Sequence, residues 1–277
     1  MKRTILITGC STGIGRTCAL GMQARGWEVF ATARKPADLD DLRRQGLQAL
    51  TLDYAEPDSI ADCIDTVLRQ TGGRLDALFN NGAYGQPGAV EDLSVDVLRR
   101  QFEANFFGWH DLTRRVVPTM RAQGHGRIIQ CSSVLGLVGL KFRGAYVASK
   151  FALEGLTDCL RLELRGTGIT VSLIEPGPIA TRFTENAVKA FEDNIDAENS
   201  AFRDAYARRK NHLRSGGENR FKLGPEAVLK KLVHAVENRN PRPRYAVTTP
   251  TYLMGGLKRV LPTRLLDAVS AKISDSQ

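Results

Sequence analysis

Short apolar runs alternate with longer amphipathic segments along the first 250 residues. Most of the short runs are continuously apolar, which is typical of strands covered on both faces of a parallel sheet, and the longer segments repeat apolar residues at helical spacing. The predicted strands span residues 3–9, 27–34, 47–53, 75–80, 127–133, 169–175 and 244–248. The predicted helices span residues 13–26, 37–45, 57–70, 94–122, 145–166 and 225–238, and the fourth is expected to break near Pro118. This order predicts an α/β fold, a single doubly wound Rossmann-type domain with about seven parallel strands.

Two segments depart from this alternation. Residues 178–223 form a polar insert rich in Arg, Asn and Glu, and inserts of this length in compact domains are usually functional. We therefore expect them to be a lid over the substrate, within a catalytic domain of residues 1–250. Residues 251–277 form a basic amphipathic tail. Such a tail can lie on an anionic membrane surface, cover the substrate cleft or cover a subunit edge, and the sequence leaves these alternatives open.

The composition narrows the classes of partner. The 277 residues carry 39 Lys and Arg against 30 Asp and Glu, a formal net charge of +9, which suits nucleic acid, anionic lipid or a polyanionic cofactor. No alternation of aromatic and basic residues accompanies the charge, and the four histidines lack metal-ligand spacing. We therefore expect neither a nucleic-acid partner nor a metal site.

The sequence also bears on where the protein works. No apolar run approaches the ~20 residues that cross a bilayer, and the first nine residues lack the pattern of a signal peptide. The five cysteines are irregularly spaced, which suits free thiols in a reducing compartment. We expect a cytoplasmic protein, with peripheral membrane contact through the tail as the alternative.

A glycine-rich turn, TGCSTGIG at residues 8–15, connects the first predicted strand to the first predicted helix. Gly9 permits a sharp turn, Gly13 lets the backbone approach a pyrophosphate, and Gly15 lets helix and sheet pack closely. The free N–H groups and the positive end of the helix dipole favour an anion. An ordinary tight turn is the alternative, but the position between a buried strand and a helix favours dinucleotide binding.

The glycine spacing, Gly-x-x-x-Gly-x-Gly, resembles that of the short-chain dehydrogenases/reductases. Other motifs of that family follow in order within residues 3–250: NNGA at 80–83, Asn105, serines at 132–133, YVASK at 146–150 and PGPIAT at 176–181. The family usually reads Asn-Asn-Ala-Gly, whereas here Gly82 precedes Ala83. Because glycine tolerates a positive φ and alanine does not, we expect a local difference in that turn, with Asn80 keeping its role.

The resemblance implies a nicotinamide cofactor, and the end of the second strand predicts which one. NAD-preferring sites place an acidic residue there, whereas this sequence has Ala33 followed by Arg34 and Lys35. A guanidinium can hold a 2′-phosphate through charge-assisted hydrogen bonds, so we expect NADP(H), with NAD(H) as the alternative cofactor. A solvated strand end is the alternative role of Arg34. The family's other frequent NADP signal, a basic residue before the second glycine, is replaced by Thr12.

The resemblance extends this to a full cofactor-binding set, in which Asp53 and Tyr54 flank the adenine. A helix cap before Pro57 is the alternative role of Asp53. The expected set is Gly9, Ser11, Thr12, Gly13, Ile14, Gly15, Arg34, Lys35, Asp53, Tyr54, Asn80, Gly82, Tyr146, Lys150, Pro176, Gly177, Ile179 and Thr181.

The resemblance also implies a catalytic set of Asn105, Ser133, Tyr146 and Lys150. The last two are four residues apart on a predicted helix and therefore share a face. Hydride transfer to a carbonyl needs a proton donor on the oxygen, and the Lys150 ammonium with an oxidised nicotinamide would lower the pKa of the Tyr146 phenol from about 10. Ser133 is expected to hydrogen-bond the substrate oxygen and Tyr146, and Ser132 to be structural. Asn105 is expected either to hold a water that relays protons to Lys150 or to satisfy a local carbonyl.

In detail, the motifs look most like the retinol and hydroxysteroid dehydrogenase branch and its bacterial aldehyde-reductase relatives, which implies a lipophilic aldehyde, ketone or alcohol. We expect a homodimer or homotetramer paired through helices around 94–117 and 145–166, as is usual in the family. A non-catalytic NADP(H)-binding sensor and a membrane-surface protein are the alternative functions. Apolar walls for the substrate, with ordinary packing as the alternative for at least half of them, are expected from Tyr84, Val138, Leu140, Phe142, Phe183, Phe191, Phe202, Tyr206 and Phe221.

Overall fold

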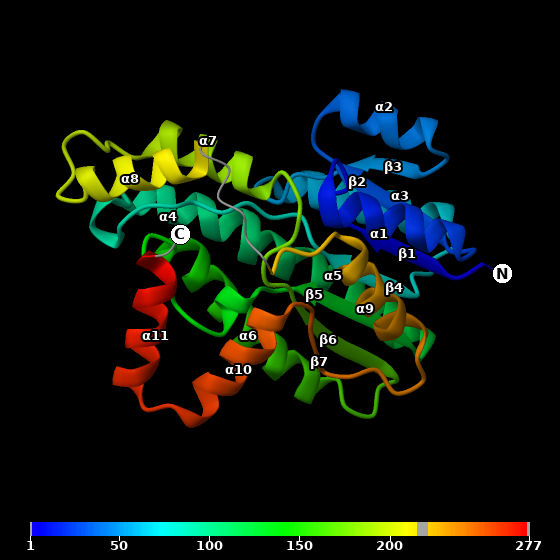
Figure 1. Ribbon diagram of the computed structural model, residues 1–277. Coiled ribbons are helices and arrows are strands. Elements are labelled where there is room, and N and C mark those ends of the chain that lie inside the picture. Colours follow the sequence, from blue (N-terminus) through cyan, green and yellow to red (C-terminus); the bar gives the residue numbers. More distant parts are fainter. Residues whose placement is uncertain (1, 215–220, 276–277) are drawn as a thin grey trace.

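Seven parallel strands form one sheet in the order β3-β2-β1-β4-β5-β6-β7 within residues 2–214 and 221–275, the part of the chain that the computed structural model describes (Figure 1). The strands are β1 Thr4–Ile7, β2 Glu28–Ala33, β3 Gln48–Thr51, β4 Ala77–Asn80, β5 Gly126–Cys131, β6 Ile169–Glu175 and β7 Arg244–Ala246. At the centre, Leu6 of β1 is in register with Phe30 of β2 on one side and Leu78 of β4 on the other. The order reverses between β1 and β4, and doubly wound sheets bind ligands at this point, outside the carboxyl ends of the strands. The predicted fold class is confirmed.

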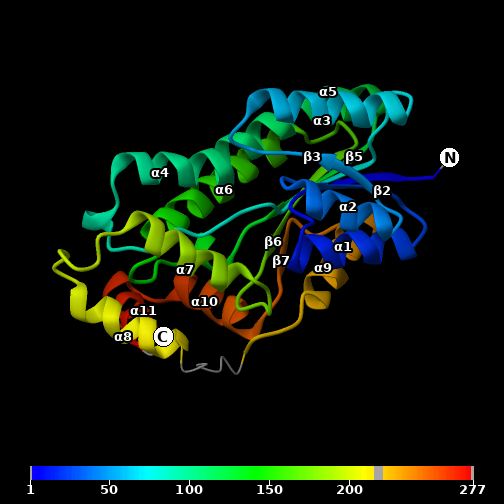
Figure 2. The same cartoon turned by 90° about the horizontal axis from the view of Figure 1, so that it is seen from above.

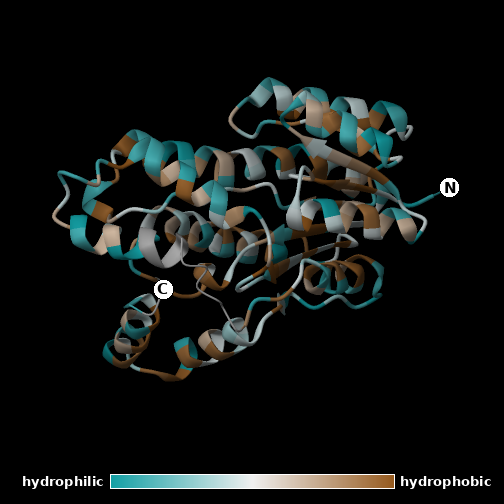
Figure 3. Ribbon diagram, turned by 45° about the horizontal axis from the view of Figure 1, so that its top comes forward, coloured by the Kyte–Doolittle hydropathy of each residue, from teal (hydrophilic) through white to brown (hydrophobic). Residues whose placement is uncertain are grey.

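Helices cover both faces of this sheet (Figure 2). One face carries α1 Gly13–Ala24, α2 Pro36–Arg44 and α9 Glu226–Glu237, and the other carries α3 Pro57–Gln70, α5 Gly108–Gln123 and α6 Gly144–Glu163. Strands β1 and β4 are buried along their whole length, as continuous apolar runs predict. Apolar residues therefore gather in the middle layer, and polar residues prevail on the outer surfaces of the helices (Figure 3).

The long predicted helix over 94–122 is broken, but not where the sequence suggested. A π-helical segment, Glu103–Phe107, separates α4 Val95–Phe102 from α5, whereas Pro118 lies inside α5. The expectation of a break near Pro118 is wrong. The buried face of α5 continues on both sides of the proline, through Val116 and Met120, and this packing keeps the helix intact.

The lid and the tail form four helices at one end of the molecule (Figures 1 and 2). The lid contains α7 Phe183–Asn194 and α8 Arg203–Arg214, while its residues 215–220 lie outside the described residues. The tail contains α10 Thr249–Val260 and α11 Thr263–Asp275. Backbone groups of α11 bind the lid directly, because Arg209 Nη2 of α8 donates to the Ser274 carbonyl at 2.6 Å. Within residues 2–214 and 221–275, no helix combines the length and the hydropathy that a bilayer span requires.

Candidate active site

The glycine-rich turn is held in place by close backbone contacts. Gly9 has φ +69°, and a Cβ at this position would lie 2.4 Å from Cα of Gly82, so neither the conformation nor the contact admits a side chain. A Cβ at Gly15 would likewise lie 2.2 Å from the Gly9 carbonyl oxygen. The turn after β1 is thereby locked against the turn after β4.

This turn fits an anionic ligand. Helix α1 begins at Gly13, and its N-cap residue, Thr12, makes no side-chain hydrogen bond to the first turn. That turn also contains no acidic residue, so its N–H groups face no competing carboxylate. A Cβ at Gly13 would lie 2.9 Å from Cγ2 of Thr181, which shows that the loop after β6 reaches the same turn. Ser11 and Ile14, which flank Thr12 and Gly13, thus lie where a pyrophosphate would be bound.

The exchanged Gly82 and Ala83 cause no unusual backbone conformation. Among the described residues, Phe142 is the one non-glycine with a positive φ, and Gly82 is not among the glycines that have one. The glycine at position 82 is needed for a different reason, because a Cβ there would lie 3.2 Å from both Gly9 N and Tyr54 Cε2. The exchange therefore brings the two turns into closer contact.

The side chains of Tyr54 and Asn80 bind each other beneath the turn. The Tyr54 hydroxyl hydrogen-bonds Thr8 Oγ1 at 2.7 Å and Asn80 Oδ1 at 3.0 Å, and Asn80 Nδ2 donates to Thr113 Oγ1 at 3.0 Å. Both residues are buried. The observed contacts give them a packing role that orders β1 and β4, and their contact with a cofactor stays a prediction.

The end of β2 presents a loose basic cluster. The Arg34 side chain is 71% exposed, and its Nη1 lies 3.9 Å from Asp53 Oδ2, while Lys35 is exposed. Asp53 Oδ1 accepts a hydrogen bond from Ala55 N at 3.1 Å, which forms a local turn. Helix α3 is capped by Glu56 instead, so the helix-cap alternative for Asp53 is wrong.

Sequence reasoning missed Arg16 in this region. Its Nη1 donates to the Ser11 carbonyl at 3.3 Å, and its guanidinium forms an ion pair with Asp41 of α2. Arg16 thereby connects the glycine-rich turn to the helix that follows Arg34 and Lys35. Its position directly after Gly15 was the available signal.

The loop after β6 connects the cofactor turn to the catalytic serine. The Pro176 carbonyl accepts a hydrogen bond from Val134 N at 2.8 Å, one residue after Ser133. A Cβ at Gly177 would lie 2.1 Å from Thr248 Oγ1, so this glycine lets α10 approach. Ile179 pairs with Leu223 in an isolated β-bridge, which ties the two ends of the lid together.

Three of the predicted catalytic residues come together at the carboxyl end of β5. Tyr146 and Lys150 project from α6, and Ser133 caps the 3-10 turn η3 Val134–Gly136. All three are buried. A hydrogen bond from Ser133 lowers the pKa of Tyr146, but burial raises this pKa by more, so the phenol titrates well above its usual range.

Lys150 is directed at the backbone. Its Nζ donates to the Cys131 carbonyl at 2.8 Å and lies 4.1 Å from the centre of the Trp109 ring. Burial lowers the pKa of Lys150 to about 8. The expected lowering of the Tyr146 pKa by this ammonium is not observed, because burial outweighs it and the ammonium is bound to the carbonyl. The sequence gave no signal for Trp109, which comes from α5 and donates its Nε1 hydrogen to the Gly82 carbonyl at 2.8 Å.

Asn105 lies inside the π-helical segment and is fully buried. Its Nδ2 donates to the Tyr84 carbonyl at 2.8 Å, and its Oδ1 accepts from Tyr84 N at 3.2 Å. The side chain therefore fixes the backbone after β4, as the local-carbonyl alternative describes. A proton relay from Asn105 to Lys150 stays a prediction.

A cluster of buried charges supports the catalytic helix from behind. Arg244 of β7 forms ion pairs with Glu154 of α6, with Glu175 at 2.6 Å and with Asp158 at 2.8 Å. Ser132 hydrogen-bonds Glu154 and lowers its pKa, but burial raises that pKa to about 7. Glu154 lies one turn after Lys150, and Ser132 directly precedes Ser133. The Arg244 cluster thus links α6, β6 and the serine loop, and it was not predicted from the sequence.

Aromatic side chains of the lid reach the catalytic tyrosine. The Phe183 ring of α7 packs edge-on against the Tyr146 ring, with 5.4 Å between the ring centres. Phe142, Phe191 and Phe202 surround Tyr206 of α8, so these four pack mainly on one another. Of the predicted apolar walls, Phe183 is the one that contacts a predicted catalytic residue through an aromatic pair.

The Tyr206 hydroxyl fastens the lid to the body of the protein. It accepts a hydrogen bond from Ala89 N at 2.7 Å and donates one to Asp92 Oδ2 at 2.5 Å. Ser200 Oγ donates to the same Asp92 oxygen at 2.6 Å. Because the backbone of Ala89 and the Tyr206 ring are buried, these bonds are shielded from water.

We expect Tyr206→Phe to loosen the lid. The change leaves the Ala89 N–H without its acceptor and Asp92 without one donor, a loss on the order of 1–2 kcal/mol. The expected result is a three- to tenfold higher KM for the best carbonyl substrate and faster proteolytic cleavage within residues 178–223. The exposed Tyr252→Phe serves as the matched control. An unchanged KM and an unchanged cleavage rate would show that this hydroxyl does not fasten the lid.

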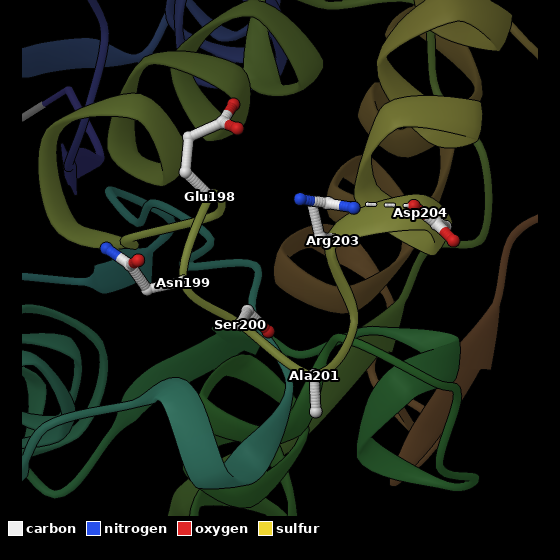
Figure 4. Close-up of a pocket in the computed structure, with 6 residues that line it drawn as sticks. All are labelled: Glu198, Asn199, Ser200, Ala201, Arg203 and Asp204. Atoms are coloured by element: carbon white, nitrogen blue, oxygen red, sulfur yellow. Dashed lines mark ion pairs between the residues drawn. The ribbon is translucent and has the colours of Figure 1, made fainter.

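Two hollows on the surface lie apart from this chemistry. One, of about 300 Å³, lies at the lid between α7 and α8 and is lined by residues 198–201, Arg203 and Asp204 (Figure 4). Its polar side chains include an ion pair between Arg203 and Asp204 at 3.7 Å but no nucleophile paired with a base. The other, of about 370 Å³, lies between residues 139–141 and α11. In the described part of the chain, no three His, Cys, Asp or Glu side chains are grouped to hold a metal.

Comparisons with known proteins agree with this geometry. A family model described as short chain dehydrogenase matches residues 3–191. The chain is similar to the uncharacterized oxidoreductase YbbO of Escherichia coli strain K12, with 43% identity over 97% of this chain and 94% of that protein. It is also similar to retinol dehydrogenase 8 of Bos taurus, with 34% identity over 94% of this chain and 86% of that protein. A solved structure of actinorhodin polyketide ketoreductase with NADPH has a TM-score of 0.72 and 27% identity, covering 89% of this chain and 95% of that chain.

The fold and the matched motifs define an oxidoreductase that acts on CH–OH groups. More particularly, the chain belongs to the short-chain dehydrogenase family, as the resemblance of its motifs implied.

Proposed function

We propose that this protein is an NADP(H)-dependent oxidoreductase of lipophilic aldehydes, ketones or alcohols. The observation that carries the proposal is the enclosed group of Ser133, Tyr146 and Lys150, with a hydrogen bond between the first two, beside an anion-binding turn. The two aromatic rings at the lid, of Phe183 and Tyr146, favour an apolar substrate. The retinol dehydrogenase relative and the ketoreductase with NADPH support the same class of reaction.

The chain's own residues divide the proton chemistry among them. When bound, the nicotinamide supplies the hydride, and NADPH, a proton and the carbonyl compound give NADP⁺ and the alcohol. Ser133 donates a hydrogen bond to the carbonyl oxygen, and Tyr146, kept protonated by its raised pKa, transfers its proton to that oxygen. Lys150 is cationic below about pH 8 and would hold the ribose hydroxyls beside Trp109.

A panel of carbonyl compounds with NADPH tests this proposal. Oxidation of NADPH with aliphatic and aromatic aldehydes, ketosteroids and retinaldehyde is followed spectroscopically, and binding of NADPH is measured separately. Turnover of any of them supports an enzyme. Tight binding of NADPH without turnover of the panel would favour the non-catalytic sensor instead.

The cofactor preference is tested at Arg34. If its guanidinium holds the 2′-phosphate, Arg34→Ala weakens NADPH binding about tenfold and leaves NADH binding unchanged. The effect is modest because the side chain is largely exposed, and it shrinks further at high salt. Dissociation constants of both cofactors at two salt concentrations give the answer, with the exposed Arg43→Ala on α2 as the control. An equal loss for NADPH and NADH would contradict this role of Arg34.

The surface favours a homodimer or homotetramer. Phe107 between α4 and α5 is 49% exposed, and Phe151 and Leu156 on α6 are also exposed. These apolar side chains lie on the helices that were expected to pair, so burying them in a subunit interface is favourable. Light scattering of the purified protein distinguishes a monomer from either oligomer.

The tail keeps one further role open to test. Tyr252, Leu253, Val260 and Leu265 are exposed on α10 and α11, interleaved with basic side chains (Figure 3). This pattern suits peripheral contact with an anionic membrane from the cytoplasmic side. Flotation of the protein with phosphatidylserine liposomes, compared with neutral ones, tests the contact.

A further inference from the structure

A guanidinium without a partner lies one helical turn before the catalytic tyrosine. Arg143 is the N-cap residue of α6 and precedes Tyr146 by three residues, a rise of about 4.5 Å along a helix. Its side chain is half-buried, and its charge lowers the pKa of the Tyr146 phenol, so the two groups face the same enclosed space. Within the described residues, no carboxylate pairs with Arg143 and no acceptor receives a hydrogen bond from its guanidinium.

The neighbouring cations differ from Arg143 in this respect. Lys141 Nζ forms an ion pair with Asp275 at 2.7 Å. Arg209 of the lid donates to the Ser274 and Lys141 carbonyls and lies 4.7 Å from the centre of the Phe142 ring. Burial and the charge of Arg209 both lower the pKa of Arg143. A guanidinium that is removed from water, repelled by a like charge and left without an acceptor is costly for the fold.

The backbone holds this costly arrangement in place. Phe142, directly before Arg143, has φ 63°, a conformation that side-chain-bearing residues rarely adopt. Its carbonyl accepts a hydrogen bond from Gly88 N at 3.1 Å, and Gly88 and Arg143 form an isolated β-bridge. Such strain persists where the surrounding structure enforces it, and it is common at ligand-binding positions.

We propose that Arg143 binds a carboxylate of the substrate, so that the preferred substrates are lipophilic carbonyl compounds that carry an acid group. The planar guanidinium matches a carboxylate with two parallel hydrogen bonds. The anion would supply the missing acceptor and offset the repulsion between Arg143 and Arg209. The Phe183 ring against Tyr146 provides the apolar part of the same substrate site. This inference rests on the proposed oxidoreductase function.

A matched pair of aldehydes tests it. The carbonyl groups of 4-carboxybenzaldehyde and of methyl 4-formylbenzoate are similarly activated, but only the first compound carries a charge. We expect kcat/KM of the parent enzyme to be at least tenfold higher for the acid. This preference should decline as the salt concentration rises, because added ions screen the pair.

Variants then assign the preference to one side chain. Arg143→Gln is expected to lower kcat/KM for the acid by ten- to hundredfold and to abolish the preference for it over the ester, and Arg143→Lys is expected to restore part of the preference. Arg69→Gln, an exposed arginine on α3, is the matched control. The melting temperature of each variant shows whether it folds.

Three outcomes would overturn the inference: an equal kcat/KM for both aldehydes in the parent, an equal loss for both in Arg143→Gln, or a loss in Arg143→Gln that follows unfolding and is not restored by Arg143→Lys. A failure of the proposed function is distinguished from these, because neither aldehyde, nor any other carbonyl compound of the panel, would then be reduced while NADPH still binds.

Discussion

Tyr146→Phe is expected to lower turnover by about 10²–10⁴-fold while the protein stays folded and still binds NADPH. The change removes one hydroxyl and keeps the ring that packs against Phe183. That hydroxyl is hydrogen-bonded to Ser133, where the substrate oxygen must receive a proton. A carbonyl oxygen that develops negative charge without a donor in an enclosed site is strongly disfavoured.

The measurement is kcat for the best substrate of the carbonyl panel, together with the dissociation constant of NADPH and the melting temperature. Unchanged binding and stability would show that the loss lies in the chemical step. Turnover within threefold of the parent would defeat the assignment of Tyr146 as the proton donor. A parallel loss of stability would instead indicate that the hydroxyl mainly supports the lid and the serine loop.

Arg244→Met is expected to be the most destabilising single change among those considered, by about 3 kcal/mol near neutral pH. Met preserves much of the side-chain volume but removes the charge that Glu154 and Glu175 share. Both carboxylates are buried and would be left without their cation. The expected cost is that of buried, unpaired charge, and it is set by how many of these groups are ionised.

The loss should therefore grow with pH. Burial already raises the folded-state pKa of Glu154 to about 7, from an ordinary value of 4.5, so this group favours the folded state below pH 4.5 and loses that contribution as the pH rises toward 7. Without Arg244 the pKa of Glu154 rises further, which extends the loss to higher pH. Chemical denaturation of parent and variant at pH 5 and pH 8 measures the difference, and Glu154→Gln added to Arg244→Met should recover part of it. An equal loss at both pH values would contradict the charge argument.

The sequence predicted the sheet well because the signals for its strands are local. Continuous apolar runs located all seven strands to within three residues at each end, and turn motifs marked the carboxyl ends of β1, β4, β5 and β6. The motifs likewise predicted Ser133, Tyr146 and Lys150 as one group, although they are separated by up to seventeen positions. Helical spacing and the order of motifs carry that information directly.

The contacts that the sequence did not predict join distant segments. Trp109 lies under Lys150, and Arg244 binds Glu154 from ninety residues away, but neither residue stands in a motif. The break before α5 also escaped prediction, since a π-helical segment has no strong local signature, whereas Pro118 has one that packing overrides. The partners of Arg143 were equally inaccessible, because a lack of acceptors is visible only in three dimensions.

The contact between Gly9 and Gly82 has a consequence for how the protein is made. The nucleotide turn is encoded within the first fifteen residues, yet one of its walls is supplied by the turn after β4. Strand β1 also needs both β2 and β4 as neighbours. A nascent chain that has emerged only as far as β3 therefore carries all three glycines of the turn without the surface that shapes it. Cofactor capture during synthesis must wait for the fourth strand, which protects the growing chain from binding nucleotide before its sheet can close.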